Sequence, residues 1–393
     1  MSAWLNPPSQ SASDYRGDRA ACDCRHPTRG RRYSRPDVAK IPRPTEALTP
    51  KSLDVAPNNE FQPHWLLRNA HLQSLITGMG LRRALIQMRP NPMVAGSREY
   101  LLDCGEGVRL QGFYTPQPDG TAPRGLVVML HGWEGSAEST YMLSMGRRLF
   151  LGGYEVFRLN LRDHGNTHHL NAGIFHSCRI AEVVGAVGEL ARRIPTRPLL
   201  TVGFSLGGNF ALRLAVRAPE SGIPLTRTVA VNPPIDPAKS LAAMDAGLFI
   251  YRRHFMQKWR RSLRRKQACF PERYDFEEWF RLGSLWEMTD HLAREHTDYS
   301  GAAEYFDGYS VAGDRLRDLR VPTTVITAAD DPIVPVSDYY ELARPDALRL
   351  EIHRYGGHCG YFSGLLLHRW IEDRVKQELD STAQEYTQPA LVV

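Results

Sequence analysis

Ser205 stands in the pentapeptide Gly203-Phe-Ser-Leu-Gly207, which joins an apolar run to a helical pattern. The run Leu199–Val202 is typical of a buried strand, and Asn209–Val216 has the spacing of a helix. A serine on so sharp a turn has strained backbone angles, and side chains two positions before and after it would collide, so glycine is needed at both. This context predicts a nucleophile elbow, which presents the serine at the carboxyl edge of a sheet. The alternative is a glycine-rich turn with an incidental serine.

A serine hydroxyl is a weak nucleophile near neutral pH, so it needs a base, and the base needs a carboxylate that orients it. Two later loops supply these groups. Asp331 follows the predicted strand Thr323–Thr327, and His358 follows the predicted strand Arg349–His353 in a loop rich in glycine. The order Ser, Asp, His, with each residue after a strand, is the order that this topology requires. We therefore predict Ser205, Asp331 and His358 as the catalytic residues.

The acid has two competitors. Asp330 precedes Asp331 directly, but consecutive residues point in opposite directions, and the distance in sequence to Pro335 favours Asp331. Asp236 is a third candidate, because it follows a turn after another predicted strand.

An acyl-transfer site also needs hydrogen-bond donors for the oxyanion that forms during the reaction. One predicted donor is the backbone N–H of Leu206, the residue after the nucleophile. The other is predicted from the loop His131-Gly-Trp133, which follows the apolar strand Leu126–Leu130, and we assign it to the N–H of Trp133. The indole ring of Trp133 can wall the acyl pocket at the same time.

The elements around these loops predict an α/β fold, because nearly all-apolar strands alternate with helices. Such strands form a mostly parallel central sheet with helices on both faces, and a hairpin is expected at one sheet edge. The hairpin strands are Arg98–Asp103 and Val108–Tyr114, the further strands are Tyr154–Leu161 and Thr226–Val231, and the helices are Ser139–Leu151, Arg179–Arg193 and Phe362–Leu379.

The chain divides by composition into a core, an insertion and two tails. Residues 1–54 lack an apolar period and are expected to be a disordered tail. Order begins in an arm, Phe61–Ser74, which is rich in aromatic and amide groups. The predicted organisation is a core with this arm over 55–236, a helical cap over 237–313, the rest of the core over 314–380, and a C-terminal tail over 381–393.

The predicted cap interleaves basic and aromatic residues between Arg252 and Phe280. Two interpretations remain open. The charges form a solvated helix face, or they attract an anionic substrate or make transient contact with a membrane surface. In the second case we expect the arginines to face outward while the apolar side chains line an acyl tunnel.

Composition excludes several other classes of protein. The 393 residues are 42% hydrophobic and 23% charged, as in an ordinary globular protein, and the net charge of +6 does not indicate nucleic-acid binding. No apolar run approaches the length of a transmembrane helix, and the first residues do not resemble a secretory signal. The six cysteines form no disulfide framework, so a reducing, cytoplasmic setting is expected.

Two clusters suggest a metal, but neither has the spacing of a common zinc site. One is Cys22-Asp-Cys24 in the predicted tail, and the other comprises His164, His168, His169 and His176. We expect no metal and no cofactor.

The motifs together resemble the α/β-hydrolase superfamily: the elbow, His131-Gly132, Asp331 four residues before Pro335, and Gly357-His358. The arm is similar to that of the bacterial YheT-like, plant EMB8-like and mammalian ABHD1/ABHD3-type subfamily through Pro63, Trp65, Asn69 and His71-Leu-Gln73. The resemblance covers about Phe61–Leu379 and implies esterase or lipase-type activity with the Ser205, Asp331 and His358 triad. The loop Arg162–His169 differs from the Arg-Gly-containing loop usual in that subfamily.

The sequence thus predicts a serine hydrolase of carboxylic esters that acts on a small-molecule or lipid acyl ester without a cofactor. Two alternatives stay open at this point. The same triad can transfer an acyl group to an alcohol instead of water, or the fold can be a non-catalytic binding protein. No oligomeric state is predicted.

Overall fold

A computed structural model describes residues 60–78, 91–364 and 367–387. The expected tail over 1–54, with Cys22 and Cys24, lies outside the described residues, as do residues 388–393. All described residues belong to one compact unit.

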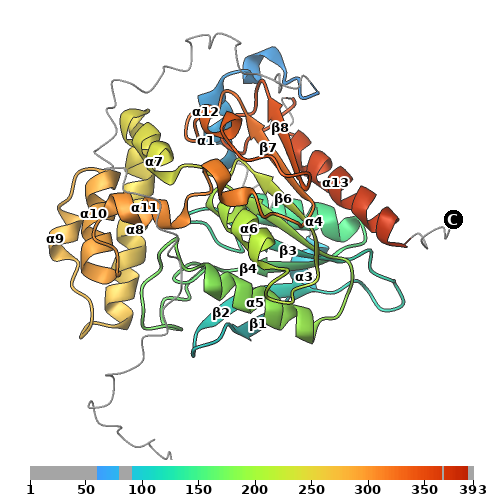
Figure 1. Cartoon of the computed structure of the whole chain (residues 1–393), viewed down its shortest axis with the longest axis horizontal. Coiled ribbons are helices and arrows are strands. Elements are labelled where there is room, and N and C mark those ends of the chain that lie inside the picture. The colour runs from blue at the N-terminus through green and yellow to red at the C-terminus, as the bar shows by residue number, and fades with distance from the viewer. Residues whose placement is uncertain (1–59, 79–90, 365–366, 388–393) are drawn as a thin grey trace, which may run out of the picture. The chain divides into compact units, whose positions relative to one another are not determined.

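The described residues form an eight-stranded sheet in the order β1-β2-β4-β3-β5-β6-β7-β8 (Figure 1). Strands β3 to β8 run parallel, whereas β2 is antiparallel to both β1 and β4. The predicted α/β class, with a mostly parallel sheet and an edge hairpin, is confirmed. The strands are β1 (Arg98–Asp103), β2 (Arg109–Thr115), β3 (Leu126–Leu130), β4 (Glu155–Leu159), β5 (Leu199–Phe204), β6 (Leu225–Val231), β7 (Thr323–Ala328) and β8 (Leu348–His353).

Two apolar layers cover the two faces of the sheet. On β3, Leu126 and Val128 pack into one layer and Val127 and Met129 into the other, which explains why this strand is apolar throughout. Helices α5 and α6 contribute to the first layer, and α4 and α13 to the second. The helices of the arm and core are η2 (Trp65–Leu67), α1 (Ala70–Gly78), α3 (Pro92–Ala95), α4 (Thr140–Leu151), α5 (Ile180–Arg193), α6 (Leu206–Arg217), α12 (Ser337–Tyr340) and α13 (Trp370–Thr387).

The last helix differs from its predicted bounds, Phe362–Leu379. Phe362 is not helical; it forms a β-bridge with Arg369, and its N–H donates to Gln73 Oε1 at 2.7 Å. The contact with Gln73, which is distant in sequence, determines the backbone conformation at Phe362 more strongly than the local helical pattern does. At the other end the helix continues to Thr387, so the described residues of the predicted tail over 381–393 are helical. Its buried face extends past Leu379 because Ala383 also packs into the core.

A run of helices lies between β6 and β7, where the sequence predicted an insertion. These helices are called the cap below, and Figure 1 shows them, in yellow to orange, grouped beside the sheet. The cap has its own aromatic centre, in which the rings of Trp259 and Trp279 lie 4.9 Å apart. Among the described helices, none has the length and apolar character needed to cross a bilayer. The cap helices are α7 (Pro237–Ala246), α8 (Phe249–Cys269), α9 (Glu277–Phe280), α10 (Leu285–His296) and α11 (Ala302–Tyr309), and η3 (Gly313–Leu316) leads back to the core.

Candidate active site

Ser205 forms the turn between β5 and α6, with φ 52° and ψ −122°. A Cβ atom on Gly203 would lie 2.2 Å from the carbonyl oxygen of Gly207, and one on Gly207 would lie 2.3 Å from that of Leu130. No side chain fits at either position, so the predicted steric reason for the two glycines is confirmed. The serine N–H donates to Val231 O at 2.8 Å, which fixes the strained turn to strand β6.

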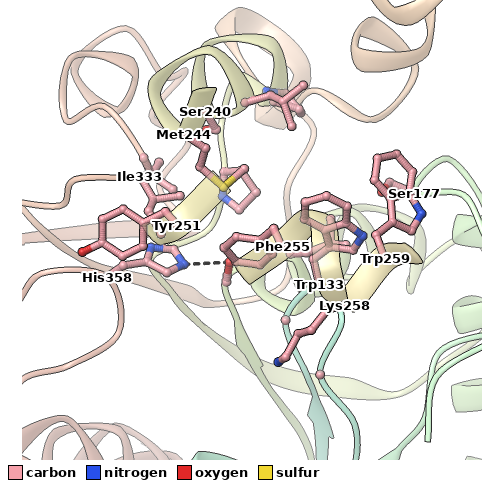
Figure 2. Close-up of a pocket in the computed structure, with 18 of the residues that line it drawn as sticks. Trp133, Ser177, Ser240, Met244, Tyr251, Phe255, Lys258, Trp259, Ile333 and His358 are labelled. Carbon is pink, nitrogen blue, oxygen red and sulfur yellow. Dashed lines mark hydrogen bonds between the residues drawn. The ribbon is translucent and has the colours of Figure 1, made fainter. Parts of the chain in front are cut away.

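Of the three residues predicted as a triad, His358 lies within hydrogen-bond distance of both Ser205 and Asp331. His358 Nε2 is 2.9 Å from Ser205 Oγ, the contact drawn as a dashed line at His358 in Figure 2. His358 Nδ1 is 2.9 Å from Asp331 Oδ2. The Asp331 side chain is fully buried, whereas 12% of the His358 side chain is exposed. Because β5, β7 and β8 are parallel, the loops that follow them meet at one edge of the sheet.

Asp331 is held by donors other than the histidine. Its Oδ1 accepts from the N–H groups of Ile333 and Val334 at 2.8 and 3.1 Å. Its Oδ2, which faces His358, also accepts from Asn232 Nδ2 at 2.7 Å. Asn232 follows β6 with a positive φ of 46°, and its Oδ1 accepts from Tyr361 Oη at 3.0 Å. No role was predicted for this asparagine, although its place directly after a parallel strand was an available signal.

The two competing carboxylates have other hydrogen-bond partners. Asp330 Oδ1 accepts from the N–H of Gly357 at 2.8 Å, and burial raises the pKa of this carboxyl group to about 6. Asp236 caps helix α7, accepting from the N–H groups of Ala238 and Lys239 at 3.0 and 3.3 Å. Asp331 is thus the carboxylate that reaches His358, while Asp330 fixes the backbone just before that histidine.

The two predicted oxyanion donors are Leu206 and Trp133, and both line the cavity around Ser205. In the part of the chain that the structure describes, neither backbone N–H donates to a protein acceptor. The neighbouring N–H of Gly132 is occupied, because it donates to Tyr141 Oη at 2.8 Å. Tyr141 therefore fixes this loop and leaves the next N–H, that of Trp133, available.

Two of the histidines that suggested a metal have hydrogen-bond partners within the protein. His164 Nε2 accepts from the N–H of Glu134 at 3.2 Å, and its Nδ1 donates to Arg162 O at 2.7 Å. His168 Nε2 pairs with Ser262 Oγ of the cap at 2.9 Å. Within residues 60–78, 91–364 and 367–387, no group of three His, Cys, Asp or Glu side chains is placed to hold a metal ion.

The arm packs against the loop that carries His358. The buried Gln73 donates to Leu67 O and Phe362 O and accepts from the Phe362 N–H. Ser74 Oγ accepts from the His358 N–H at 2.8 Å. The sequence indicated that the arm belongs to the folded body, but it gave no sign that Ser74 contacts the histidine.

A cavity of about 530 Å³ opens around Ser205 between the core and the cap. In Figure 2, His358, Tyr251 and Ile333 lie on one side of it and Trp133 and Trp259 on the other. The cap packs on the loop that contains Trp133, since the ring of Phe255 stacks on that of Trp133 with centroids 5.2 Å apart. The lining is mainly apolar, so the cavity suits an uncharged, largely hydrocarbon group.

Several cap arginines, Arg253, Arg261 and Arg264 among them, are exposed as the sequence suggested, but other cap cations have partners inside the protein. Lys266 is fully buried and donates to Asp163 Oδ1 at 2.8 Å and to the carbonyl oxygens of the 168–173 loop. Arg260 donates to Leu282 O at 2.7 Å, and Arg265 donates to Asn166 Oδ1 at 2.8 Å. Much of this charge therefore fastens the cap together and to the core, an arrangement that depends on partners distant in sequence.

Three curated proteins are similar to this chain in sequence. The chain is 27% identical over 329 residues to YheT of Escherichia coli (strain K12), which carries the provisional name of an esterase; the match covers 80% of this chain and 92% of that protein. It is 24% identical to the monoacylglycerol lipase ABHD2 of Danio rerio, over 47% of each chain. It is 22% identical to a monoacylglycerol lipase of Saccharomyces cerevisiae, over 63% of this chain and 57% of that one. The predicted resemblance to the YheT-like and ABHD-type proteins is confirmed.

Solved structures share the fold at low sequence identity. The Pyrococcus furiosus esterase Pf2001 matches with a TM-score of 0.50 and 16% identity, over 76% of this chain and 94% of that one. A 2,6-dihydroxy-pseudo-oxynicotine hydrolase matches with a TM-score of 0.53 and 18% identity, over 82% and 80%. The family profile described as "Alpha/beta hydrolase family" matches residues 127–366, which span β3 to the loop after His358. With this match over more than half of its length, the chain belongs to the α/β-hydrolase family.

Proposed function

We propose that the protein is a serine hydrolase that cleaves carboxylic esters through an acyl-enzyme. The observation that carries the proposal is the hydrogen-bonded series Ser205, His358 and Asp331, which ends in a cavity beside two unpaired backbone N–H groups. A nucleophile, a base oriented by a carboxylate, and oxyanion donors are the parts that acyl transfer needs.

In the first half of the reaction, Ser205 Oγ attacks the carbonyl carbon of the ester while its proton passes to His358 Nε2. The oxyanion that forms is stabilised by the N–H groups of Leu206 and Trp133. Asp331 holds the imidazole in the tautomer with Nδ1 protonated and stabilises the imidazolium. The C–O bond to the alcohol then breaks, and the imidazolium returns its proton to the leaving oxygen.

In the second half, water attacks the acyl-enzyme. His358 takes a proton from that water, the bond from the acyl carbon to Ser205 Oγ breaks, and the proton returns to the serine. The products are the free carboxylic acid and the regenerated enzyme, and no cofactor enters the balance.

The substrate class follows from the cavity and from the relatives. A volume of about 530 Å³ lies within the usual range for small-molecule sites, roughly 300–1,000 Å³. The apolar lining favours an ester with a hydrocarbon acyl chain, in keeping with the relatives named as an esterase and as monoacylglycerol lipases. We infer a small-molecule or lipid acyl ester as the substrate.

The described cysteines, Cys104, Cys178, Cys269 and Cys359, are free thiols, which supports the reducing, cytoplasmic setting expected from the sequence.

The test is hydrolysis of p-nitrophenyl esters of increasing acyl length by the wild-type chain and by Ser205→Ala. We expect turnover by the wild type and a loss of about 10⁴-fold or more in kcat for the variant, with circular dichroism unchanged. Turnover that survives in the variant, or a wild-type chain inactive on the whole series, would overturn the proposal. Adding methanol separates acyl transfer from hydrolysis, because a transferase gives methyl ester in preference to acid.

A further inference from the structure

The first turn of helix α8 exposes consecutive large apolar side chains. Phe249 and Ile250 are 61% and 51% exposed, and Leu248, which caps the helix, is 45% exposed. On helix α1 of the arm, Leu72 is 39% exposed. Contiguous apolar patches on a protein surface mark sites of interaction, whereas scattered single residues do not. We call Leu72, Leu248, Phe249 and Ile250 the mouth patch.

The mouth patch lies at the opening of the candidate active site. Ile250 is half exposed to solvent and also lines the cavity, together with its neighbour Tyr251 and with Leu75 of α1. The arm and the cap meet here, because His71 Nδ1 lies 3.1 Å from Tyr251 Oη. Figure 2 shows Tyr251 beside His358, so this rim is close to the reacting groups.

The charge beside the patch is positive. Helix α8 carries eight Arg and Lys residues and no acidic residue. Those in its second half mostly have partners within the protein, as described above, but Arg252 and Arg253 adjoin the patch. The Arg252 guanidinium lies 5.5 Å from the centre of the Phe249 ring, and in the described part of the chain neither arginine forms an ion pair.

We propose that the mouth patch docks on the surface of an anionic lipid bilayer and delivers a lipid ester directly into the cavity. This inference rests on the proposed ester hydrolase function and extends it to the source of the substrate. Apolar side chains flanked by arginines are the composition that enters the boundary between headgroups and acyl chains, and the anionic headgroups pair with the cations. The patch adjoins the opening, so an acyl chain can pass from the lipid into the apolar cavity without crossing water.

The test is co-sedimentation of the full chain carrying Ser205→Ala with vesicles of phosphatidylcholine, with or without phosphatidylglycerol, so that no hydrolysis changes the lipid. We expect binding to the anionic vesicles that weakens with added salt. The double variant Leu248→Ser/Phe249→Ser should lower binding about tenfold or more, because it loses two large apolar side chains. Arg252→Gln/Arg253→Gln should abolish the preference for phosphatidylglycerol.

Two matched controls locate the effect. Leu101→Ser/Leu151→Ser removes exposed leucines elsewhere, and Arg261→Gln/Arg264→Gln removes two charges from the second half of the same helix; both should bind like the parent. The inference is overturned if the Leu248/Phe249 variant binds as tightly as the parent, or if either control loses binding equally. It is also overturned if sedimentation velocity shows that the patch pairs two copies of the chain.

The docking proposal and the proposed function can fail separately. With Ser205 intact, Leu248→Ser/Phe249→Ser should retain the turnover of p-nitrophenyl acetate while losing turnover of vesicle-bound ester. A chain that binds vesicles but hydrolyses no ester contradicts the proposed function alone. A chain that hydrolyses p-nitrophenyl acetate but does not bind anionic vesicles contradicts the docking proposal alone.

Discussion

The backbone N–H of His358 donates a hydrogen bond of 2.8 Å to Ser74 Oγ, a residue 284 positions earlier in the chain. The same serine donates to Ala70 O within helix α1 at 2.7 Å. Gly357 completes the contact, because a Cβ atom there would lie 2.5 Å from Ala70 O. The arm thus supports the loop of the proposed base, and damage to the arm should affect both stability and catalysis.

Gln73→Ala tests the role of the arm. The change leaves the carbonyl groups of Leu67 and Phe362 and the N–H of Phe362 without their buried partner. We expect the free energy of unfolding to fall by about 2–3 kcal/mol, measured by urea denaturation, together with a lower kcat. Gln257→Ala, an exposed glutamine of helix α8, is the control and should change neither quantity. Equal stability of the two variants would contradict the assignment.

The neighbouring aspartates test the choice of acid. Asp331→Asn should lower kcat roughly 10⁴-fold, because the amide cannot hold the imidazole in the required tautomer. Asp330→Asn should retain most of the activity, since its amide oxygen can still accept from the Gly357 N–H. Steady-state kinetics on a p-nitrophenyl ester compares them directly, and the reverse ranking would make Asp330 the acid.

Asp330 also predicts a dependence of stability on pH. Burial raises its pKa to about 6 in the folded protein, from an ordinary value of 3.8. Between these values the folded state holds more protons than the unfolded state, so stability falls as the pH rises through that window. The free energy of unfolding of Asp330→Asn, relative to that of the wild type, should therefore rise by about 1–3 kcal/mol between about pH 4 and about pH 7. Denaturation curves at several pH values measure this difference, and a constant difference across the window would refute it.

Tyr141→Phe tests the loop that contains Trp133, a proposed oxyanion donor. The change frees the Gly132 N–H, loosens the loop that carries Trp133, and should lower kcat about tenfold while KM changes little. The control is Tyr154→Phe, which removes another tyrosine hydroxyl, one that donates to Asp380 far from the site. Both variants should lose some stability, but only the first should lose kcat. A similar kcat for the two would leave Tyr141 a structural role alone.

Lys266→Met tests the attachment of the cap to the core. The change leaves the buried Asp163 carboxylate without its cation and several carbonyl groups without a donor. Removing one partner of a buried ion pair typically costs about 3–5 kcal/mol. Thermal melting should show this loss, whereas Arg261→Met, an exposed residue of the same helix, should melt like wild type. A small effect for both would mean that the cap is held by its apolar contacts.

Local patterns made much of the site predictable. The glycines around Ser205 are needed by the turn itself, and the order of the loops follows from strands that are apolar on both faces. Asn232, Tyr141 and Ser74 were missed because their roles depend on partners such as Asp331, Gly132 and His358, which the fold brings close. The start of helix α13 was misplaced for the same reason, since Phe362 binds Gln73 of the arm.

The contacts of the cap arginines also depend on segments that are distant in sequence. A helix such as α8, with many cations and no acids, reads from its sequence as a uniform basic face. In the folded protein Arg260 and Arg265 contact Leu282 and Asn166. Which cations have a partner within the protein is therefore decided by packing between segments.

The central claim is that Ser205 is the nucleophile. The most direct measurement is to treat the folded chain with a fluorophosphonate probe and to locate the adduct by peptide mass spectrometry. We expect a single adduct on Ser205, which is absent in Ser205→Ala and forms much more slowly in Asp331→Asn and in His358→Ala. No adduct on the folded wild-type protein, or an adduct on another residue that persists in Ser205→Ala, would contradict it.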